Sequence, residues 1–200
     1  MNVYDISQEL LSCKVYPGDP VPSVTGLCSI GNGDLYNLSS LTLCVHNGTH
    51  IDAPAHFIKD GKTVEQLSLN ALVGECCVFE HQGVMTVQQA QNFVDRARSS
   101  SKESAVRILF KGDSVISADA AQVFAESGIL LLGVESQSVG PIDAPMKVHM
   151  ILLEKEVVLL EGLCLDTVCK EGKYLLSAAP LNIAGIEGSP CRAVLIDCFE

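Results

Sequence analysis

The stretch from residue 46 to residue 57 constrains this chain more than any other, because it concentrates metal-ligating side chains around backbone-breaking residues. Three of the five histidines of the chain lie in it, as His46, His50 and His56. Asp52 stands two positions after the second of them. Imidazole and carboxylate groups are the usual protein ligands of zinc and similar divalent ions. The stretch therefore predicts half of a metal site.

The surrounding residues favour a strand that ends in a tight loop. Apolar and polar side chains alternate over Ser40–His46, which is the period of a strand. Gly48 and Pro54 argue against a helix through the motif, and the glycine would let the backbone turn so that the imidazoles converge. Asp52 has two carboxylate oxygens and could bridge two ions. His56 is either a further ligand or a general acid/base beside a bound ion.

A simpler interpretation has to be weighed, since a single histidine is more often an ordinary hydrogen-bonded residue than a ligand. Three histidines and an aspartate at this spacing favour a metal site and the catalytic centre of a small hydrolase. Of the other histidines, His81 is expected in a surface turn, whereas His149 precedes a second candidate ligand, Glu161. Glu161 ends an apolar run, so it is either a buried carboxylate that needs a partner or the point where a strand reaches solvent.

Composition predicts one globular domain over residues 1–200. Apolar residues make up 48% of the chain and the mean hydropathy is +0.29, which suffices for a full core. The net charge of −11 disfavours nucleic acid and anionic membranes as partners. Neither a bilayer-spanning apolar run nor a signal peptide is recognisable. We therefore expect a cytoplasmic protein that acts on a small molecule, with its nine cysteines reduced and structural.

Strands and helices alternate along the chain, which predicts a mixed α/β fold. Helices are expected over Thr86–Ala97 and from Ser117 to Glu126, with shorter helical pieces at Val64–Leu72 and Val148–Leu153. A polar loop is expected over Glu135–Pro145. The expected strands are Val3–Ile6, Leu35–Asn37, Ser40–His46, Glu75–Glu80, Val106–Phe110, Ile129–Val134, Val157–Leu160, Tyr174–Ala178 and Ala193–Cys198.

These residues resemble the signature of the cyclase-type family of metal-dependent hydrolases, which includes the bacterial kynurenine formamidases and the isatin hydrolases. The histidine-rich motif from His46 to His56, with its glycine, aspartate and proline, carries the resemblance most specifically. Weaker segments follow in the order of the family over nearly the whole chain. They are Tyr4–Ser7, Tyr16–Asp19, Leu132–Ser138, Val148–His149 and Leu160–Leu163.

The resemblance implies a swivelling β/β/α fold and a centre of two divalent ions, either zinc or manganese. His46, His50 and Asp52 would bind the first ion, with Asp52 reaching both. His149 and Glu161 would complete the second. The family also forms oligomers with the active site near a subunit interface, so the resemblance implies a homodimer or a homotetramer.

The resemblance further implies hydrolysis of an N-formyl arylamine, such as N-formyl-kynurenine to kynurenine and formate in tryptophan catabolism. His56 would be the proton-transfer residue. Tyr16 takes the position at which the formamidases carry a tryptophan against the substrate ring, and Gly140 stands where they tend to carry aspartate. Both departures concern the substrate rather than the metal.

Two alternatives stay open. The same metal site could open a lactam or lactone, as in isatin hydrolysis, or carry out a cyclisation. A non-catalytic, metal-stabilised binding or assembly protein is the other alternative. His56 distinguishes an enzyme from this non-catalytic alternative, because a proton-transfer group beside metal ligands is what an active site needs.

Overall fold

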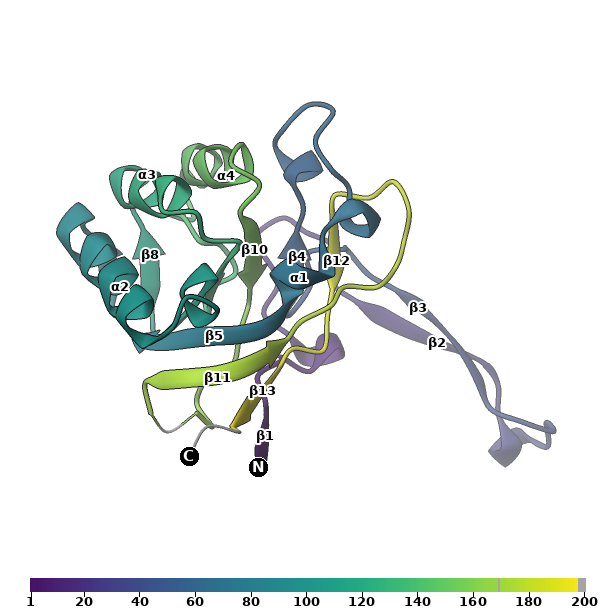
Figure 1. The fold of residues 1–200 in the computed structure, drawn as a ribbon. Coiled ribbons are helices and arrows are strands. Elements are labelled where there is room, and N and C mark those ends of the chain that lie inside the picture. Colours follow the sequence, from purple (N-terminus) through teal and green to yellow (C-terminus); the bar gives the residue numbers. More distant parts are fainter. Residues whose placement is uncertain (169, 198–200) are drawn as a thin grey trace.

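A curled sheet with helices on one face forms the body of the molecule in the computed structural model, which describes residues 1–168 and 170–197 (Figure 1). Nine strands form this sheet, and its four central strands run parallel while the outer pairs are antiparallel. In spatial order the strands are β1 (Asn2–Asp5), β13 (Val194–Asp197), β11 (Gly172–Ser177), β5 (Val73–Glu80), β7 (Arg107–Lys111), β9 (Leu131–Val134), β10 (Val158–Glu161), β4 (His50–Asp52) and β12 (Gly188–Pro190).

The central strands are buried on both faces, because alternate side chains enter two separate cores. Ile108 and Phe110 of β7 pack in the core beneath the helices, whereas Leu109 between them packs in the core on the opposite face. This explains why these strands read as continuous apolar runs. The helices that cover the first core are α2 (Val87–Ser100), α3 (Ala118–Glu126) and α4 (Met146–Leu153).

The long helices begin where their capping residues predict. The Thr86 side chain accepts from Gln89 N and completes a capping box at the start of α2, and Ser117 accepts from Ala120 N at the start of α3. The expected helical piece at Val64–Leu72 is split into a 3₁₀ turn and the short helix α1 (Leu69–Leu72). That 3₁₀ turn is Val64–Gln66, and further 3₁₀ turns are Leu10–Ser12, Ile30–Asn32, Pro54–His56 and Ser104–Val106.

An antiparallel hairpin of β2 (Ser23–Cys28) and β3 (Leu38–Thr42) projects from the body as an arm (Figure 1). The expected strand Leu35–Asn37 is wrong, because these residues lie in the loop at the tip of the arm. The expected strand Ser40–His46 is wrong at its end, since β3 stops at Thr42 and His46 lies in a turn. That turn forms because Asn47 N donates to Cys44 O while Cys44 N donates to Asn47 Oδ1.

Smaller features complete the fold. A parallel pair of short strands, β6 (Gly83–Met85) and β8 (Ser114–Ile116), lies outside the main sheet. Seven cysteines carry free thiols, while Cys169 and Cys198, the last residue of an expected strand, lie outside the described residues. No helix within residues 1–168 and 170–197 has the length and apolar character needed to cross a bilayer.

Candidate metal centre

Strand β4 places two candidate ligands on one face of the sheet. His50 and Asp52 are two residues apart in a strand, so their side chains point to the same side. Gly48 has a φ of +64°, a left-handed conformation that glycine adopts without strain and that turns the chain into β4. The turn expected at this glycine is therefore confirmed. In the ladder, His50 lies opposite Glu161 of β10 on one side and Pro190 of β12 on the other.

His46 reaches the same point from the turn before β4. Its Nδ1 lies 2.9 Å from Asp52 Oδ1, and its Nε2 lies 3.5 Å from Glu187 Oε1. The ring packs against Gly188 of β12 so closely that a Cβ at that glycine would stand 2.6 Å from His46 Cε1. The imidazole can therefore take this position only because residue 188 is a glycine, which has no Cβ.

The second pair of candidate ligands comes from α4 and the end of β10. His149 Nε2 lies 3.1 Å from Glu161 Oε1 and 3.5 Å from Asp52 Oδ2. Glu161 is 2% exposed and accepts a hydrogen bond from Val139 N. The sequence left open whether Glu161 is buried or solvent-facing, and it is buried with partners.

Two sets of ligand atoms converge, and each set lies within 4.8 Å. Asp52 belongs to both sets. The first set is His46, His50 and Asp52, and the second is Asp52, His149 and Glu161.

The donor set fits a divalent ion. His46 Nε2 and Asp52 Oδ2 are buried and make no hydrogen bond, which is costly unless another partner is present. Backbone carbonyls orient two of the rings, because His50 Nδ1 lies 3.0 Å from Gly48 O and His149 Nδ1 lies 2.9 Å from Pro145 O. With Nδ1 donating to those carbonyls, each Nε2 is left to face the carboxylates, an arrangement typical of metal-ligating histidines.

The pKa values of the candidate ligands are shifted because the imidazoles and carboxylates lie close together. Burial alone lowers the pKa of His50, but the hydrogen bond to Glu161 and the charge of Asp52 outweigh it and raise that pKa to about 9. The same balance raises the pKa of His149 to about 10. Burial raises the pKa of Asp52, but its imidazole neighbours outweigh this and hold it well below its ordinary value. Burial and the Asp52 charge raise the pKa of Glu161, but His149 and His50 outweigh them and hold it below its ordinary value, so both carboxylates are ionised and available to a cation.

His56 stands beside the ligands and is not a member of either ligand set. It ends the 3₁₀ turn Pro54–His56, and its ring centroid lies 4.2 Å from that of His46 and 5.9 Å from that of His149. Burial lowers the pKa of His56, more than the Asp52 charge raises it. A neutral imidazole at this place can accept a proton near neutral pH.

A pocket of about 210 Å³ opens over the candidate ligands. Tyr16 lines it as expected, and its hydroxyl donates to Ile142 O at 2.7 Å. Sequence reasoning did not name the five other lining residues as site residues, which are Asp19, Phe57, Gln137, Ser138 and Pro145. For Asp19 the proline–glycine turn that precedes it was the available signal.

Gln137 carries an unusual feature for a pocket residue. Both its Nε2 and its Oε1 are buried and make no hydrogen bond. A buried amide left unpaired costs about 1–3 kcal/mol, so such a group needs a partner. An amide offers both a donor and an acceptor to a molecule in the pocket.

His81 is the one histidine far from the centre, and its expected place in a surface turn is wrong. It is 7% exposed, its Nδ1 lies 2.8 Å from Ser114 Oγ, and its ring packs edge-on against Phe93 and Phe110. The chain buries this residue because it connects β5 to β6 beneath α2, which a local sequence pattern does not reveal.

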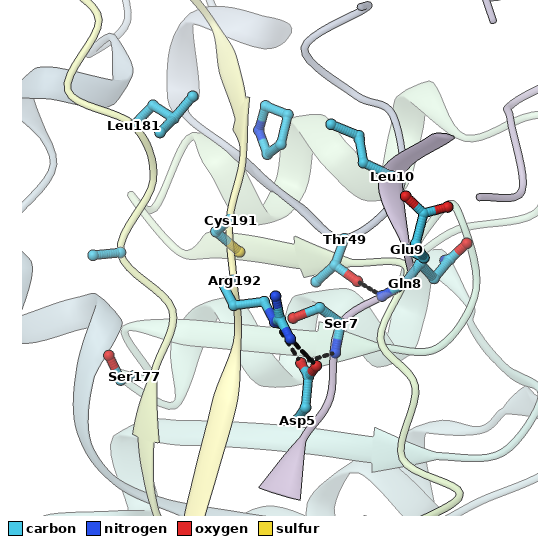
Figure 2. A pocket seen from close by; sticks show the side chains of 12 residues that line it. Asp5, Ser7, Gln8, Glu9, Leu10, Thr49, Ser177, Leu181, Cys191 and Arg192 are labelled. Atoms are coloured by element: carbon cyan, nitrogen blue, oxygen red, sulfur yellow. Dashed lines mark hydrogen bonds and ion pairs between the residues drawn. The ribbon is translucent and has the colours of Figure 1, made fainter. Parts of the chain in front are cut away.

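A second hollow, of about 670 Å³, lies on the other side of the motif (Figure 2). Thr49 faces it and accepts a hydrogen bond from Gln8 N, while the neighbouring His50 belongs to the candidate metal centre. An exposed ion pair joins Asp5 to Arg192 beside it. Neither of the two candidate ligand sets lies in this hollow, so the smaller pocket is the candidate active site.

Relatives with known names match this chain over almost its full length. The "Kynurenine formamidase" of Bacillus mycoides is 36% identical, over 96% of this chain and 95% of the relative. The "Kynurenine formamidase" of Erythrobacter litoralis is 33% identical, over 96% of this chain and 93% of the relative.

Solved structures agree with this relationship. A structure described as a potential metal-dependent hydrolase with cyclase activity is 27% identical, with a TM-score of 0.81 over 100% of this chain and 99% of that one. Isatin hydrolase A from Labrenzia aggregata shares the fold, with a TM-score of 0.81 over 97% and 93% of the two chains at 19% identity. These likenesses confirm the mixed α/β fold. The family model "Cyclase" matches residues 4–141, and this chain therefore belongs to the cyclase family.

Proposed function

We propose that this protein is a metal-dependent hydrolase that cleaves the formyl C–N bond of an N-formyl arylamine, such as N-formyl-kynurenine, to give the amine and formate. One observation carries the proposal. Three imidazoles and two carboxylates converge from β4, β10, α4 and a turn, and two buried polar atoms among them make no hydrogen bond. The names of the relatives support the substrate class.

The ligand roles follow from which atoms face each other. We assign one divalent ion to His46, His50 and Asp52, and a second ion to Asp52, His149 and Glu161. Imidazole and carboxylate ligands suit zinc and manganese, and we propose one of these metals. When bound, a divalent ion would lower the pKa of a coordinated water from its high ordinary value to about 7 and would polarise a carbonyl oxygen.

His56 is the residue we assign to proton transfer. Its imidazole lies beside His46 and His149, is neutral near pH 7 because burial lowers its pKa, and lines the pocket. It would take a proton from the attacking water and deliver it to the leaving nitrogen. Proton transfer by a positioned side chain is worth about 10²–10⁴-fold in rate.

Two pocket residues would orient the substrate. Tyr16 offers an aromatic face and is held by its hydroxyl, which donates to Ile142 O. The amide of Gln137 has a free donor and a free acceptor for the formamide group. The pocket volume of about 210 Å³ limits the substrate portion it encloses to one small ring with its formamide.

We also propose that the chain forms one domain and assembles as a homo-oligomer in the cytoplasm. The arm, defined as residues 20–43, supports the assembly. An isolated two-stranded hairpin is marginally stable in water, and this one carries a single charged residue, Asp34. Its strongly exposed apolar side chains are Val21, Val24, Leu27, Ile30, Leu35, Tyr36, Leu38 and Leu41.

The experiment is a substrate panel on protein loaded with zinc or with manganese. We expect turnover of N-formyl-kynurenine, loss of turnover with EDTA, and recovery when metal is added back. Isatin and simple lactones in the same panel test ring opening as the alternative. Full activity and full metal content in a His50→Ala, Asp52→Ala double variant would refute the assigned metal site, whereas no turnover of N-formyl-kynurenine by metal-loaded protein would refute the function.

A further inference from the structure

His46 faces the candidate metal centre with a different ring nitrogen from the other two histidine ligands. In His50 and His149, Nδ1 lies against a backbone carbonyl oxygen and Nε2 faces the carboxylates. His46 is reversed, because its Nδ1 lies 2.9 Å from Asp52 Oδ1. Its Nε2 is buried and makes no hydrogen bond within the described residues, so His46 lacks the carbonyl that orients the other two rings.

Glu187 is the residue that faces this second nitrogen. Its Oε1 lies 3.5 Å from His46 Nε2, slightly beyond the length of a usual N–H···O hydrogen bond. No other ion pair involves the Glu187 carboxylate in residues 1–168 and 170–197. The Glu187 side chain is 42% exposed and that of His46 is 14% exposed. A partly hydrated carboxylate is thus available to a largely buried ring without the cost of burying a charge.

The backbone holds Glu187 beside the ring. Ala53 N, directly after β4, donates to Glu187 O at 2.8 Å, and Gly188 lies opposite Asp52 in the ladder of β12 and β4. Gly188 also makes room for the ring, because a Cβ there would stand 2.6 Å from His46 Cε1. Two consecutive residues therefore act on one imidazole: the glycine lets the ring approach, and the glutamate faces its Nε2.

We propose that Glu187 is a positioning residue of the metal centre, whose carboxylate accepts a hydrogen bond from His46 Nε2 and so leaves Nδ1 unprotonated as the atom that binds the ion. This role rests on the proposed function and deepens it, since it needs an ion at His46. Metal-ligating histidines commonly donate their other ring N–H to a carboxylate or a carbonyl oxygen, which fixes the tautomer and the orientation of the ring. His50 and His149 have carbonyls for this purpose, and Glu187 supplies the equivalent acceptor for His46.

The tautomer of each histidine ligand is the direct test. Long-range ¹H–¹⁵N correlation spectra of zinc-loaded protein with ¹⁵N-labelled histidines show which ring nitrogen carries the proton. At pH 7 we expect His46 to carry it on Nε2, whereas His50 and His149 carry it on Nδ1. A His46 proton on Nδ1, with the ion at Nε2, would overturn the proposal. Wild-type protein that binds no zinc would overturn both the proposal and the function on which it rests.

Glu187→Ala removes the acceptor and shows whether it acts on His46. The His46 Nε2 proton should exchange faster with water and move upfield, while the signals of His50 and His149 stay in place. Zinc affinity, measured by competition with a chromogenic chelator, should fall about 10-fold or more, which is the usual loss when such a partner is removed. Wild-type zinc affinity in Glu187→Ala, or a His46 signal that this variant does not move, would overturn the role of Glu187.

A second variant separates the hydrogen bond from the charge. Glu187→Gln keeps the side-chain length and an oxygen that can accept, so its zinc affinity should lie between those of wild type and Glu187→Ala. A Glu187→Gln protein with an affinity as low as that of Glu187→Ala would make the lost charge responsible and overturn the hydrogen bond. Glu80→Ala is the control, because it removes a carboxylate from an exposed position of β5 and should leave zinc affinity and the His46 signal unchanged.

These measurements do not depend on turnover, so they separate the role of Glu187 from the proposed reaction. Zinc-loaded protein that shows the expected tautomers and hydrolyses no formamide would refute the proposed function alone. Protein that hydrolyses N-formyl-kynurenine, with a His46 signal unmoved by Glu187→Ala, would refute the positioning role alone.

Discussion

His50 of β4 and Glu161 of β10 lie directly opposite each other in an antiparallel ladder, with His50 Nε2 3.4 Å from Glu161 Oε2. The register of two strands therefore brings together candidate ligands that are far apart in the sequence. A sheet fixes such a pair more precisely than loops do, because each strand is held by its neighbours on both sides. Asp52 lies two residues further along β4, on the same face of the sheet as His50, and belongs with Glu161 to the second ligand set.

Glu161→Gln tests this pairing with little change of volume. The substitution removes one carboxylate and presents an amide to His50 and His149, so we expect metal affinity to fall about 10-fold or more. Metal content after dialysis and a zinc titration measure this. Glu80→Gln makes the same change at an exposed position of β5 and should leave metal content unaltered. Equal zinc affinity in the two variants would remove Glu161 from the ligand set.

Metal binding should release protons. The pKa of His50 is raised to about 9 and that of His149 to about 10, above the ordinary histidine value, so both rings are protonated at pH 7 in the metal-free protein. An ion must displace these protons, and its affinity should therefore increase with pH and level off near pH 10. Calorimetric enthalpies of zinc binding at pH 7, measured in buffers of different ionisation enthalpy, give the number released. A buffer-independent enthalpy would contradict the prediction.

The same shifts predict how the metal-free protein responds to pH. A histidine whose pKa is raised by folding stabilises the folded state below pH 6.5, its ordinary pKa, and this contribution disappears as pH rises through the folded-state value. The stabilisation from His50 and His149 should thus be present at pH 6 and lost between about pH 7 and pH 10. Metal-loaded protein should not lose it, because the ion then replaces the protons.

His56→Ala separates proton transfer from metal binding. His56 belongs to neither ligand set, so metal content should be unchanged while kcat falls about 10²–10⁴-fold. The reference is His50→Ala, which should lose both metal and turnover. A His56→Ala protein that retains wild-type turnover would show that another group moves the proton, and loss of its metal would make His56 a ligand.

The types and spacing of the candidate ligands were easier to predict from the sequence than the tertiary environment of those residues. The motif was recognisable because ligand types and spacing are local properties of the chain, and the helices were recognisable because Thr86 and Ser117 cap them. The pairing of the motif with Glu161 was implied only by resemblance. Glu161 is buried because β10 lies between β9 and β4 in the sheet. A periodic sequence pattern does not reveal which strands are neighbours.

Other incorrect predictions have the same cause, because a local sequence pattern does not reveal tertiary contacts. The alternating pattern after Ser40 is that of a strand with one apolar face, but in the arm that face meets no core, so Leu41 remains exposed. Asp19 and Gln137 reach the pocket through loops whose course depends on tertiary contacts. His81 looked like a surface residue because the sequence around it is polar, yet α2 covers it through Phe93.

Gly188→Ala tests how closely the fold fits the His46 ring. A Cβ at this position would stand 2.6 Å from His46 Cε1, so the ring must move away from the ligand set. Overpacking of this kind costs about 1–3 kcal/mol, and we expect a lower zinc affinity together with a modest loss of stability. Gly26→Ala is the matched control, because nothing lies within 4 Å of a Cβ there. Unchanged zinc affinity in Gly188→Ala would mean that His46 is not held in the way the structure indicates.

The arm offers a test of assembly that does not depend on catalysis. Leu35 at its tip is 95% exposed and Tyr36 beside it is 57% exposed, so neither stabilises the isolated chain and both are available to a second copy. A Leu35→Asp, Tyr36→Asp variant should therefore keep its thermal unfolding in the monomer yet show a smaller mass by light scattering than the wild-type oligomer. Val84→Asp places the same charge at an exposed position of β6 and should leave the mass unchanged. An oligomer of unaltered mass in the arm variant would contradict assembly through the arm, since two aspartates buried without partners oppose such an interface.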